Sequence, residues 1–400
     1  MSTRLAILTT HPIQYHAPWF RELAAHPQVD LDVLYCHNAT PGEQAGAGFG
    51  VEFNWDVSLL SDYQYRFLEN TAPNPTVHNF QGMDTPGVRK IIAEEKFDAV
   101  IVNGWHYKSA WQTMRACWKT QTPVMMRSDS HLRTERSSAK QIAKWPLYRW
   151  FIPKLDACLP VGQWSRDYFL HYGADPNKVF VVPHTVDDTY FSREAARLRP
   201  RRSELRKVWG LDEKAIVFVF VGKLIEKKRP MDFLRAMKVL AGSGVNVAGL
   251  LVGDGPLRAE CEQFIQRENL PVHMAGFLNQ SRIAEAYVAS DALVLPSDGG
   301  ETWGLVVNEA MACGIPCFVS DRVGCGPDMI AGPGAGRIFS LGNTDELANW
   351  LLEFAQDESM RTEMAKQAGA TAASRSMKTA VAGTLEAVKI VLKERQNKHE

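Results

Sequence analysis

The chain reads Pro296-Ser297-Asp298-Gly299-Gly300-Glu301-Thr302-Trp303-Gly304-Leu305-Val306-Val307-Asn308-Glu309-Ala310-Met311-Ala312 in its C-terminal third. An apolar run at 292–295 predicts a buried strand that leads into this stretch, and Gly304 opens a predicted helix. The backbone amides of Gly304 and Leu305 favour an anion at the helix N-terminus. The carboxylates of Glu301 and Glu309 can accept hydrogen bonds from sugar hydroxyls. The stretch therefore predicts a site for a phosphate and a sugar.

This stretch resembles the Glu-x7-Glu motif of retaining glycosyltransferases of family 4, which have the GT-B fold. The ordered matches around it are Gly276-Phe277, Tyr287, Ser290-Asp291-Ala292, Pro296-Ser297, Gly314-Ile315-Pro316 and a turn from Gly324 to Asp328. The resemblance implies that Glu309 accepts hydrogen bonds from the donor ribose. It also implies that Glu301 lies beside the transferred sugar as a catalytic residue, and that Thr302, Gly304 and Leu305 line the donor site.

Length and composition indicate a globular protein of two domains. The chain has 400 residues, of which 45% are hydrophobic, and this length exceeds that of one ordinary core. Lys+Arg and Asp+Glu are balanced at 45 each, so no net field attracts nucleic acid. The 7 cysteines are scattered without zinc-ligand spacing, so we expect reduced thiols and no metal site. No signal peptide or membrane-spanning run is evident, so we expect a cytoplasmic protein.

Short apolar runs alternate with amphipathic helical patterns along the whole chain, which predicts an α/β protein with parallel sheets. The expected strands are 5–8, 31–35, 99–102, 124–126, 157–159, 179–182, 216–221, 247–252, 272–274, 292–295, 317–319 and 337–339. We expect two Rossmann-like, doubly wound domains that face a central cleft, as in GT-B proteins. The boundaries are 1–183 for the acceptor domain and 184–375 for the donor domain, with 184–206 as a charged linker. A helix at 376–400 is expected to pack back on the first domain, by resemblance.

Two cations follow the predicted strand at 216–221. By resemblance, Gly222, Lys223 and Lys228 match a strand-end motif that grips the donor pyrophosphate, with Lys223 where the family has an arginine. Two positive charges there would offset charge that develops on the leaving group. The alternative is a solvated lysine run after a strand.

Two further stretches of the second half are expected to line the donor site. Gly253, in the turn after the strand at 247–252, lets the backbone approach a ligand. The alternative at that turn is a purely structural βα connection. Phe277 and Leu278 stand where the family holds the nucleobase, chiefly through backbone groups.

The loop after the first strand is dense in polar and aromatic side chains. Family members often carry two glycines here, whereas this chain carries His11, Gln14, Tyr15 and His16. Because the carboxyl ends of parallel strands face the cleft, we expect these four residues to bind the acceptor or to close over the donor. The alternative is a rigid turn that Pro12 and Pro18 fix.

Two other strand ends carry candidates for the polar group on the acceptor side. His106 follows the strand at 99–102, and Asp129 and His131 follow the strand at 124–126. Many family members place a histidine where this chain has Asp129. Asp129 and His106 are the catalytic candidates, and the choice between them stays open. His131 is weighed against a purely structural role.

The segment 132–151 combines Arg133, Arg136, Lys140 and Lys144 with Trp145, Trp150 and other apolar residues. A basic, aromatic-rich amphipathic segment can contact the anionic surface of a membrane. The alternative is a helix whose apolar side packs on its own domain, with a kink at Pro146.

The sequence therefore predicts a retaining, metal-independent glycosyltransferase. We expect a nucleotide-sugar donor, a glycan or lipid-linked acceptor of a cell-surface glycoconjugate, no cofactor, and no nucleic acid partner. Two alternatives remain at this point: a catalytically silent nucleotide-sugar binding or scaffold protein, and another GT-B enzyme such as an epimerase. A dinucleotide dehydrogenase is disfavoured, because the first strand is not followed by Gly-x-Gly-x-x-Gly.

Overall fold

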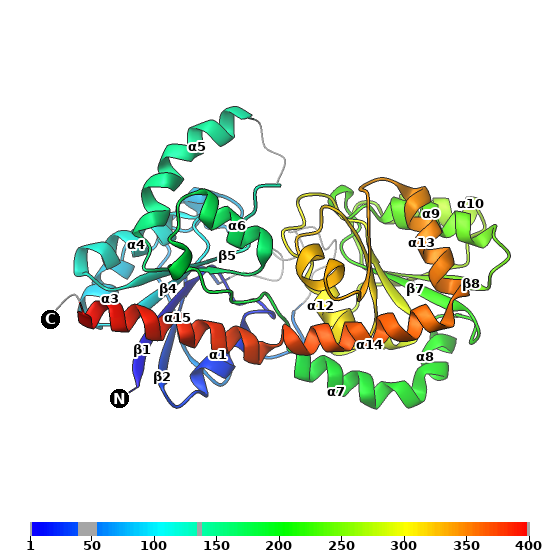
Figure 1. Cartoon of the computed structure of the whole chain (residues 1–400), viewed down its shortest axis with the longest axis horizontal. Coiled ribbons are helices and arrows are strands. Elements are labelled where there is room, and N and C mark those ends of the chain that lie inside the picture. Colours follow the sequence, from blue (N-terminus) through cyan, green and yellow to red (C-terminus); the bar gives the residue numbers. More distant parts are fainter. Residues whose placement is uncertain (1, 39–53, 134–137, 398–400) are drawn as a thin grey trace.

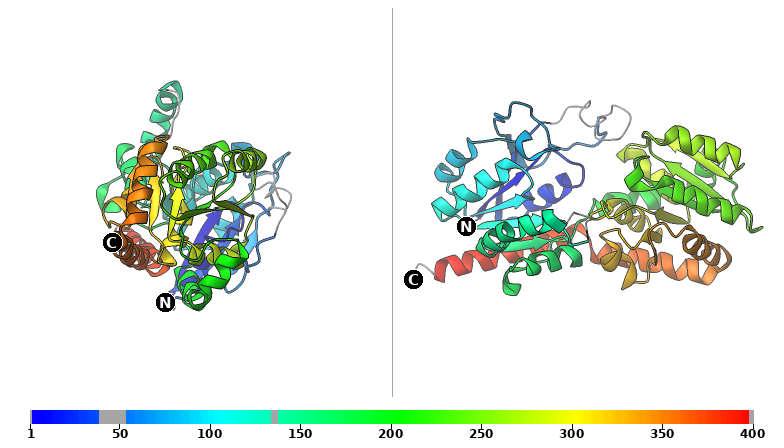
Figure 2. Two further views of the ribbon diagram at one scale, coloured as in Figure 1. Left: turned by 90° about the vertical axis from the view of Figure 1, so that its right-hand side faces the viewer. Right: turned by 90° about the horizontal axis from the view of Figure 1, so that it is seen from above.

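The computed structural model describes residues 2–38, 54–133 and 138–397, and it shows two parallel β-sheets that lie side by side (Figures 1 and 2). Each sheet has six strands, one sheet in each half of the chain, and helices cover both faces. This arrangement confirms the predicted α/β fold with two doubly wound domains. It follows from the buried apolar runs, which must be covered on both sides.

The N-terminal sheet has the strand order β3-β2-β1-β4-β5-β6, and every adjacent pair is parallel. Leu5, Ala6, Ile7 and Leu8 of β1 are fully buried, because this central strand is covered on both faces. The strands are β1 Thr3–Thr9, β2 Val29–Tyr35, β3 Gln64–Phe67, β4 Ala99–Asn103, β5 Val124–Ser128 and β6 Ala157–Pro160. The helices are α1 Ala17–Ala24, α3 Val88–Glu94, α4 Lys108–Thr120, α5 Ser138–Phe151 and α6 Gln163–His171.

The C-terminal sheet has the order β12-β11-β10-β7-β8-β9 and is also parallel throughout. In both sheets the order reverses beside a central strand, and such switch points leave a crevice at the carboxyl ends of the strands. The strands are β7 Ile216–Val221, β8 Val247–Val252, β9 Val272–Gly276, β10 Ala292–Leu295, β11 Cys317–Ser320 and β12 Gly336–Phe339. The helices are α7 Asp188–Leu198, α8 Arg202–Val208, α9 Pro230–Ala241, α10 Arg258–Arg267, α11 Gln280–Ala289, α12 Leu305–Ala312, α13 Thr344–Gln356 and α14 Glu358–Ser374.

The last helix, α15 (Met377–Asn397), returns to the N-terminal domain (Figures 1 and 2). It packs against α1 and β6, and its residues Met377, Ala387 and Val391 are buried in the same core as the first strand. The indole Nε1 of Trp19 donates a hydrogen bond to the Thr384 hydroxyl across this contact, at 3.3 Å. The chain therefore crosses between the domains twice.

The segment 184–206, expected to be a linker, is largely helical and belongs to the second domain. Helix α7 packs on α11 and α12, and Asp187 caps it by accepting a hydrogen bond from the Tyr190 amide at 2.8 Å. Phe191, Ala195 and Leu198 are buried on one face of that helix. The charged residues of the segment cover its other face, which is why its composition resembles that of a linker.

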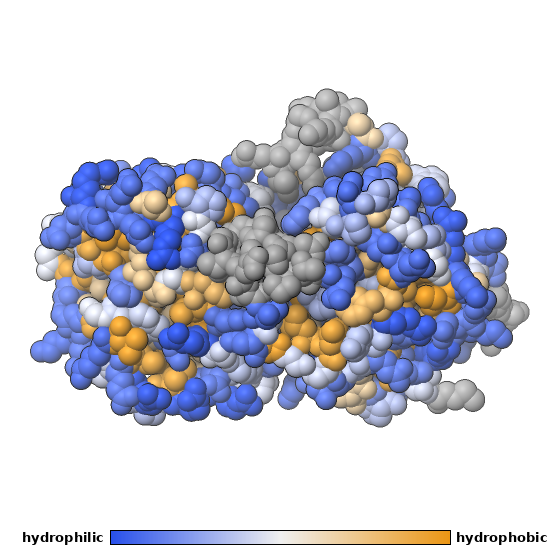
Figure 3. Space-filling model, turned by 180° about the vertical axis from the view of Figure 1, so that it is seen from behind, coloured by the Kyte–Doolittle hydropathy of each residue, from blue (hydrophilic) through white to orange (hydrophobic). Residues whose placement is uncertain are grey.

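Two strand predictions differ from the structure. Residues 179–182 form only an isolated parallel bridge, between Cys158 and Val179, although the amides of Phe180 and Val182 donate to β6 carbonyls at 2.9 Å. Strand β3 was not predicted, because Gln64–Phe67 lies at a sheet edge with exposed side chains and no apolar run. On the face seen in Figure 3, the surface of both domains is mainly hydrophilic, with apolar patches between the hydrophilic areas.

Candidate active site

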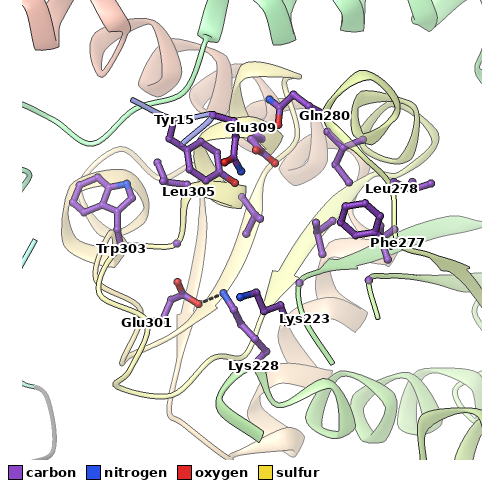
Figure 4. Close-up of a pocket in the computed structure, with 18 of the residues that line it drawn as sticks. Tyr15, Lys223, Lys228, Phe277, Leu278, Gln280, Glu301, Trp303, Leu305 and Glu309 are labelled. Carbon is purple, nitrogen blue, oxygen red and sulfur yellow. Dashed lines mark hydrogen bonds and ion pairs between the residues drawn. The ribbon is translucent and has the colours of Figure 1, made fainter. Parts of the chain in front are cut away.

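A cavity of about 300 Å³ lies between the two domains, at the carboxyl ends of their central strands (Figure 4). The C-terminal domain supplies most of its wall, from the ends of β7, β8 and β9 and from the start of α12. The loop after β1 closes the cavity from the N-terminal domain with Gln14 and Tyr15. We call this space the donor cavity.

The donor cavity brings together every residue predicted for the donor site. These residues come from separate segments, and the parallel sheet gathers them because all its strands end at one edge. They are Gly222, Lys223, Lys228, Gly253, Phe277, Leu278, Glu301, Thr302, Gly304, Leu305 and Glu309.

At two positions of this wall the backbone conformation requires glycine. Gly253 has φ +137°, and a Cβ there would lie 1.9 Å from the carbonyl oxygen of Gly222. Gly304, which precedes α12, has φ +99°, and its Cβ would lie 3.0 Å from Leu295 and 3.1 Å from Val323. Only glycine adopts such conformations without strain, so both turns can hold backbone close to a ligand.

One side of the cavity holds a carboxylate and two lysines (Figure 4). Lys228 and Glu301 form an ion pair with little solvent exposure. Burial raises the pKa of Glu301, but Lys228 and Lys227 more than offset this, so its pKa lies below the usual value. Burial, followed by repulsion from Lys228 and Lys227, lowers the pKa of Lys223 to about 8. The wall thus offers two cations to an anionic ligand: Lys228, which is paired with Glu301, and Lys223, whose charged form is disfavoured by burial and by the neighbouring lysines.

The other side holds Glu309, which is 3% exposed. The Tyr287 hydroxyl donates to Glu309 Oε2 at 2.6 Å. The Tyr15 side chain lies beside Glu309 in Figure 4, and its hydroxyl, like that of Tyr287, acts to lower the pKa of this carboxyl group. Burial raises the pKa of Glu309 to about 7, despite these two hydroxyls. A ligand that brings hydroxyl donors would favour the ionised form.

A second cavity of about 320 Å³ adjoins the donor cavity on the N-terminal side. His11, His16, His106 and Asp129 line it, while Tyr15 lines both cavities. Gln14 lines the donor cavity but not this second cavity. Of its two expected roles, acceptor binding and closure over the donor, its location favours closure over the donor. We call this space the acceptor cavity, because His11, Tyr15, His16, His106 and Asp129, all predicted for the acceptor side, line it.

Asp129 stands between the two cavities and accepts a hydrogen bond from the Thr302 hydroxyl at 2.6 Å. His106 lines the acceptor cavity but not the donor cavity, and burial lowers its pKa although Asp129 partly counteracts this. His131 lines neither cavity and packs on Trp164, with ring centroids 5.3 Å apart. Asp129 is therefore the better placed of the candidates to contact groups on both sides.

Several residues of the two cavities were not predicted. They are Trp55, His184, Gln280, Ile283 and Trp303 in the donor cavity, and Asn103 and Arg127 in the acceptor cavity. Asn103 and Arg127 directly follow the predicted strands at 99–102 and 124–126, at the same sheet edge as Asp129. Trp55 follows residues 39–53, which are not described, and no motif pointed to it.

Comparison with known proteins covers both halves of the chain. A family profile described as Glycosyl transferases group 1 matches residues 201–371. A profile described as Glycosyltransferase Family 4 matches residues 21–190. The two matched regions correspond to the two domains.

Among curated relatives, the N-acetyl-alpha-D-glucosaminyl L-malate synthase of Bacillus anthracis is 29% identical over 200 residues. That match covers 50% of this chain and 50% of the relative, so the chain spans about half the length of that protein. Two solved structures share the fold. A glycosyltransferase from Rickettsia africae ESF-5 has a TM-score of 0.74 at 15% identity, covering 98% of this chain and 99% of that one. Anabaena Alr3699/HepE in complex with UDP has a TM-score of 0.72 at 19% identity, covering 96% and 99%.

Proposed function

Since this chain belongs to glycosyltransferase family 4 and has the GT-B fold, we propose that it transfers a sugar from a nucleotide-sugar donor to an acceptor hydroxyl. The donor occupies the donor cavity, and the acceptor approaches from the acceptor cavity. The observation that carries this proposal is the position of Glu301, Lys228 and Glu309 on the walls of one cavity that two glycine turns also line.

Each wall of the donor cavity suits one part of a nucleotide-sugar. The ribose hydroxyls donate to Glu309, with which the Tyr15 and Tyr287 hydroxyls interact in the free protein. The diphosphate lies beside Lys223, Lys228 and the N-terminus of α12. Phe277 and Leu278 flank the base, and Glu301 accepts hydrogen bonds from the transferred sugar.

We propose a retaining reaction without a metal ion. The bond from the anomeric carbon to the diphosphate oxygen breaks, and a bond to the acceptor oxygen forms on the same face of the sugar. The acceptor proton passes to an oxygen of the leaving diphosphate. Lys223 and Lys228 stabilise the charge that develops on that leaving group, and Glu301 stabilises the positive anomeric centre. Asp129 or His106 orients the acceptor.

The donor is a substrate, and the proposal includes no resident cofactor. The acceptor is a glycan or a lipid-linked glycan of a cell-surface glycoconjugate. Among the described residues, no helix has the length and apolar character to cross a membrane.

Calorimetric titration tests the donor site. Purified protein is titrated with UDP, GDP, ADP, dTDP and CMP, with and without EDTA, beside Glu309→Ala. The matched control is Glu353→Ala on an exposed position of α13. We expect one nucleotide to bind without regard to EDTA, with binding lost in Glu309→Ala and kept in the control. If no nucleotide binds, the donor assignment is wrong.

We further propose that α5 contacts an anionic membrane surface. Trp145 and Trp150 are each 49% exposed and Leu147 is 44% exposed, although buried positions of the same helix pack on its domain. Lys154 Nζ lies 3.9 Å from the centroid of the Trp150 ring, and Arg149 lies over Trp145 at 5.6 Å. Exposed tryptophans beside cations are typical of helices at a lipid interface. Residues 134–137, including Arg136 of the predicted segment, lie outside the described residues.

Vesicle sedimentation tests this contact. The protein is mixed at low salt with phosphatidylcholine vesicles that contain or lack phosphatidylserine. We expect sedimentation only with the anionic vesicles, and its loss in the double variant Trp145→Ser, Trp150→Ser. The control is Val208→Ser, an exposed apolar residue of the other domain. Equal sedimentation of the double variant would exclude α5 as the contact.

A further inference from the structure

The acceptor cavity contains a buried guanidinium without a carboxylate partner. Arg127 ends β5, is 5% exposed and lines the cavity. Within the described residues, no carboxylate forms an ion pair with it, and its Nε has no hydrogen-bond partner. Nη2 makes long contacts, 3.4 Å to the Pro183 carbonyl and 3.5 Å to His184 Nδ1. The guanidinium also lies over the Trp19 ring, whose centroid is 4.9 Å from Cζ.

The groups around Arg127 do not balance its charge. His16 and His184 lie next to it, and burial followed by the charge of Arg127 lowers the pKa of each ring, to about 3 for His16. Both imidazoles are therefore neutral near pH 7. Burial also lowers the pKa of His106. His11, Tyr15 and Asp129 are the other titratable groups that line the cavity.

Asp129 is the one carboxylate among the residues that line this cavity. Its charge favours the ionised form of Arg127, but burial dominates and lowers the pKa of the guanidinium to about 10. The Asp129 carboxylate bonds instead to Thr302, at the boundary with the donor cavity. The cavity thus has a carboxylate at its boundary with the donor cavity, and a cation that forms no ion pair with a described residue on a part of the wall that the donor cavity does not share.

A buried cation without a partner is costly, whereas an anionic ligand would compensate it. The planar fork of arginine fits the two oxygens of a carboxylate or a phosphate, and neutral imidazoles can donate further hydrogen bonds. The space of about 320 Å³ is large enough for a small polar molecule and shares Tyr15, Asp129 and His184 with the donor cavity.

We propose that the acceptor carries an anionic group, a carboxylate or a phosphate, that binds Arg127 in the acceptor cavity while the acceptor hydroxyl faces Asp129. The inference rests on the proposed function, because it specifies the acceptor of that reaction. It makes Arg127 a specificity-determining residue, which would select charged over neutral acceptors.

Calorimetry with inorganic phosphate and with succinate tests the anion site, with glycerol as the neutral probe. Phosphate can also enter the donor cavity, so wild type, Arg127→Met and Lys228→Met are compared. We expect at least about tenfold weaker binding of both anions in Arg127→Met, because a charge-assisted contact is lost, and little change for succinate in Lys228→Met. Loss of binding only in Lys228→Met would place the anions in the donor cavity and overturn the proposal.

A wild-type measurement covers the case in which Arg127→Met does not fold. The NMR signal of the Arg127 Nε–H is identified by its absence in Arg127→Lys, and phosphate or succinate is then added to the wild-type protein. A shift of that signal at saturation is the expected result, and no shift with either anion would refute the site. This measurement does not depend on nucleotide binding. If no nucleotide binds but the Arg127 signal shifts, the donor site is wrong and the anion site stands; if a nucleotide binds but the signal does not shift, only the anion site is wrong.

Discussion

Tyr15, from the first loop of the N-terminal domain, lies beside Glu309 of the C-terminal domain (Figure 4), and its hydroxyl interacts with the Glu309 carboxyl group and acts to lower the pKa of that group. Tyr287 donates to the same group from within the second domain, at 2.6 Å. In the free protein, the Tyr15 hydroxyl therefore interacts with the carboxyl group that a ribose hydroxyl is proposed to contact. A ligand must displace it or share the carboxylate with it.

Replacement of Tyr15 by phenylalanine should tighten nucleotide binding. A hydrogen bond to a charged group contributes on the order of 1.5–3 kcal/mol, so removal of a competing Tyr15 hydroxyl from the free protein should increase affinity by at least about tenfold. Calorimetry at about pH 8.5 keeps Glu309 ionised in both proteins. Tyr65→Phe, at an exposed position of β3, is the control. Unchanged or weaker binding would show that Tyr15 does not compete with the nucleotide.

Glu309 should make the fold less stable as pH rises from about 4.5 to about 7. In this window the unfolded chain has lost the proton from Glu309 while the folded protein retains it, because burial raises the folded pKa to about 7. The full effect is of order 3 kcal/mol, developed progressively across the window. Chemical unfolding of wild type and Glu309→Gln at several pH values measures it. The difference in stability between the two proteins should shift in favour of Glu309→Gln as pH rises, and a constant difference would contradict the prediction.

Nucleotide affinity should pass through a maximum between about pH 7 and about pH 8. Below this range Glu309 is protonated and is a poorer acceptor for ribose hydroxyls. Above it Lys223, whose pKa burial lowers to about 8, loses the charge that attracts the diphosphate. Dissociation constants measured across this range give the profile. Glu309→Gln should remove the acidic limb, and Lys223→Arg should remove the alkaline one.

Lys228→Met should lower kcat/KM for sugar transfer by about 10²–10³, since the leaving group loses a fixed cation. It also leaves Glu301 buried without its main counter-charge, so the pKa of that carboxylate should rise. Steady-state kinetics of Lys228→Met are compared with those of Lys228→Arg, which keeps the charge. The comparison separates the effect of the lost charge from that of the changed side-chain shape. Lys238→Met, on the exposed side of α9, is the control. Wild-type kinetics in Lys228→Met would rule out a role for this lysine.

Gly253→Ala should destabilise the protein far more than Gly244→Ala. Both glycines have positive φ, +137° and +79°, but a Cβ at Gly253 would overlap the Gly222 carbonyl while Gly244 has open space around it. Gly244→Ala therefore measures backbone strain alone, on the order of 1 kcal/mol. Thermal unfolding and nucleotide binding of both variants provide the comparison. Equal effects would show that the close approach at Gly253 does not matter.

The glutamate stretch was sufficient to predict the fold and most of the donor cavity. Glu301, Gly304 and Glu309 lie on one short strand-loop-helix unit, so their relative positions depend on local sequence alone. Lys223 and Gly253 follow the neighbouring strands β7 and β8 of a parallel sheet, and this topology brings the ends of such strands together whatever the intervening sequence.

The contacts between the domains could not be predicted in this way. The contact between Tyr15 and Glu309 depends on the relative orientation of the two domains, and no periodicity in the sequence predicts that orientation. Arg127 was overlooked for a related reason. An arginine at a strand end is usually exposed or paired, and only the packed structure shows that it is neither.

The return of α15 to the first domain has a consequence for the order of folding during synthesis. Met377, Ala387 and Val391 complete the core that also holds Leu5 and Ile7, so the domain made first on the ribosome lacks part of its interior until the last helix emerges. Apolar surface on α1 and β6 remains uncovered while the whole second domain is translated. We therefore expect the nascent chain to need protection by chaperones during that interval. Truncation of α15 should leave this apolar surface uncovered for longer.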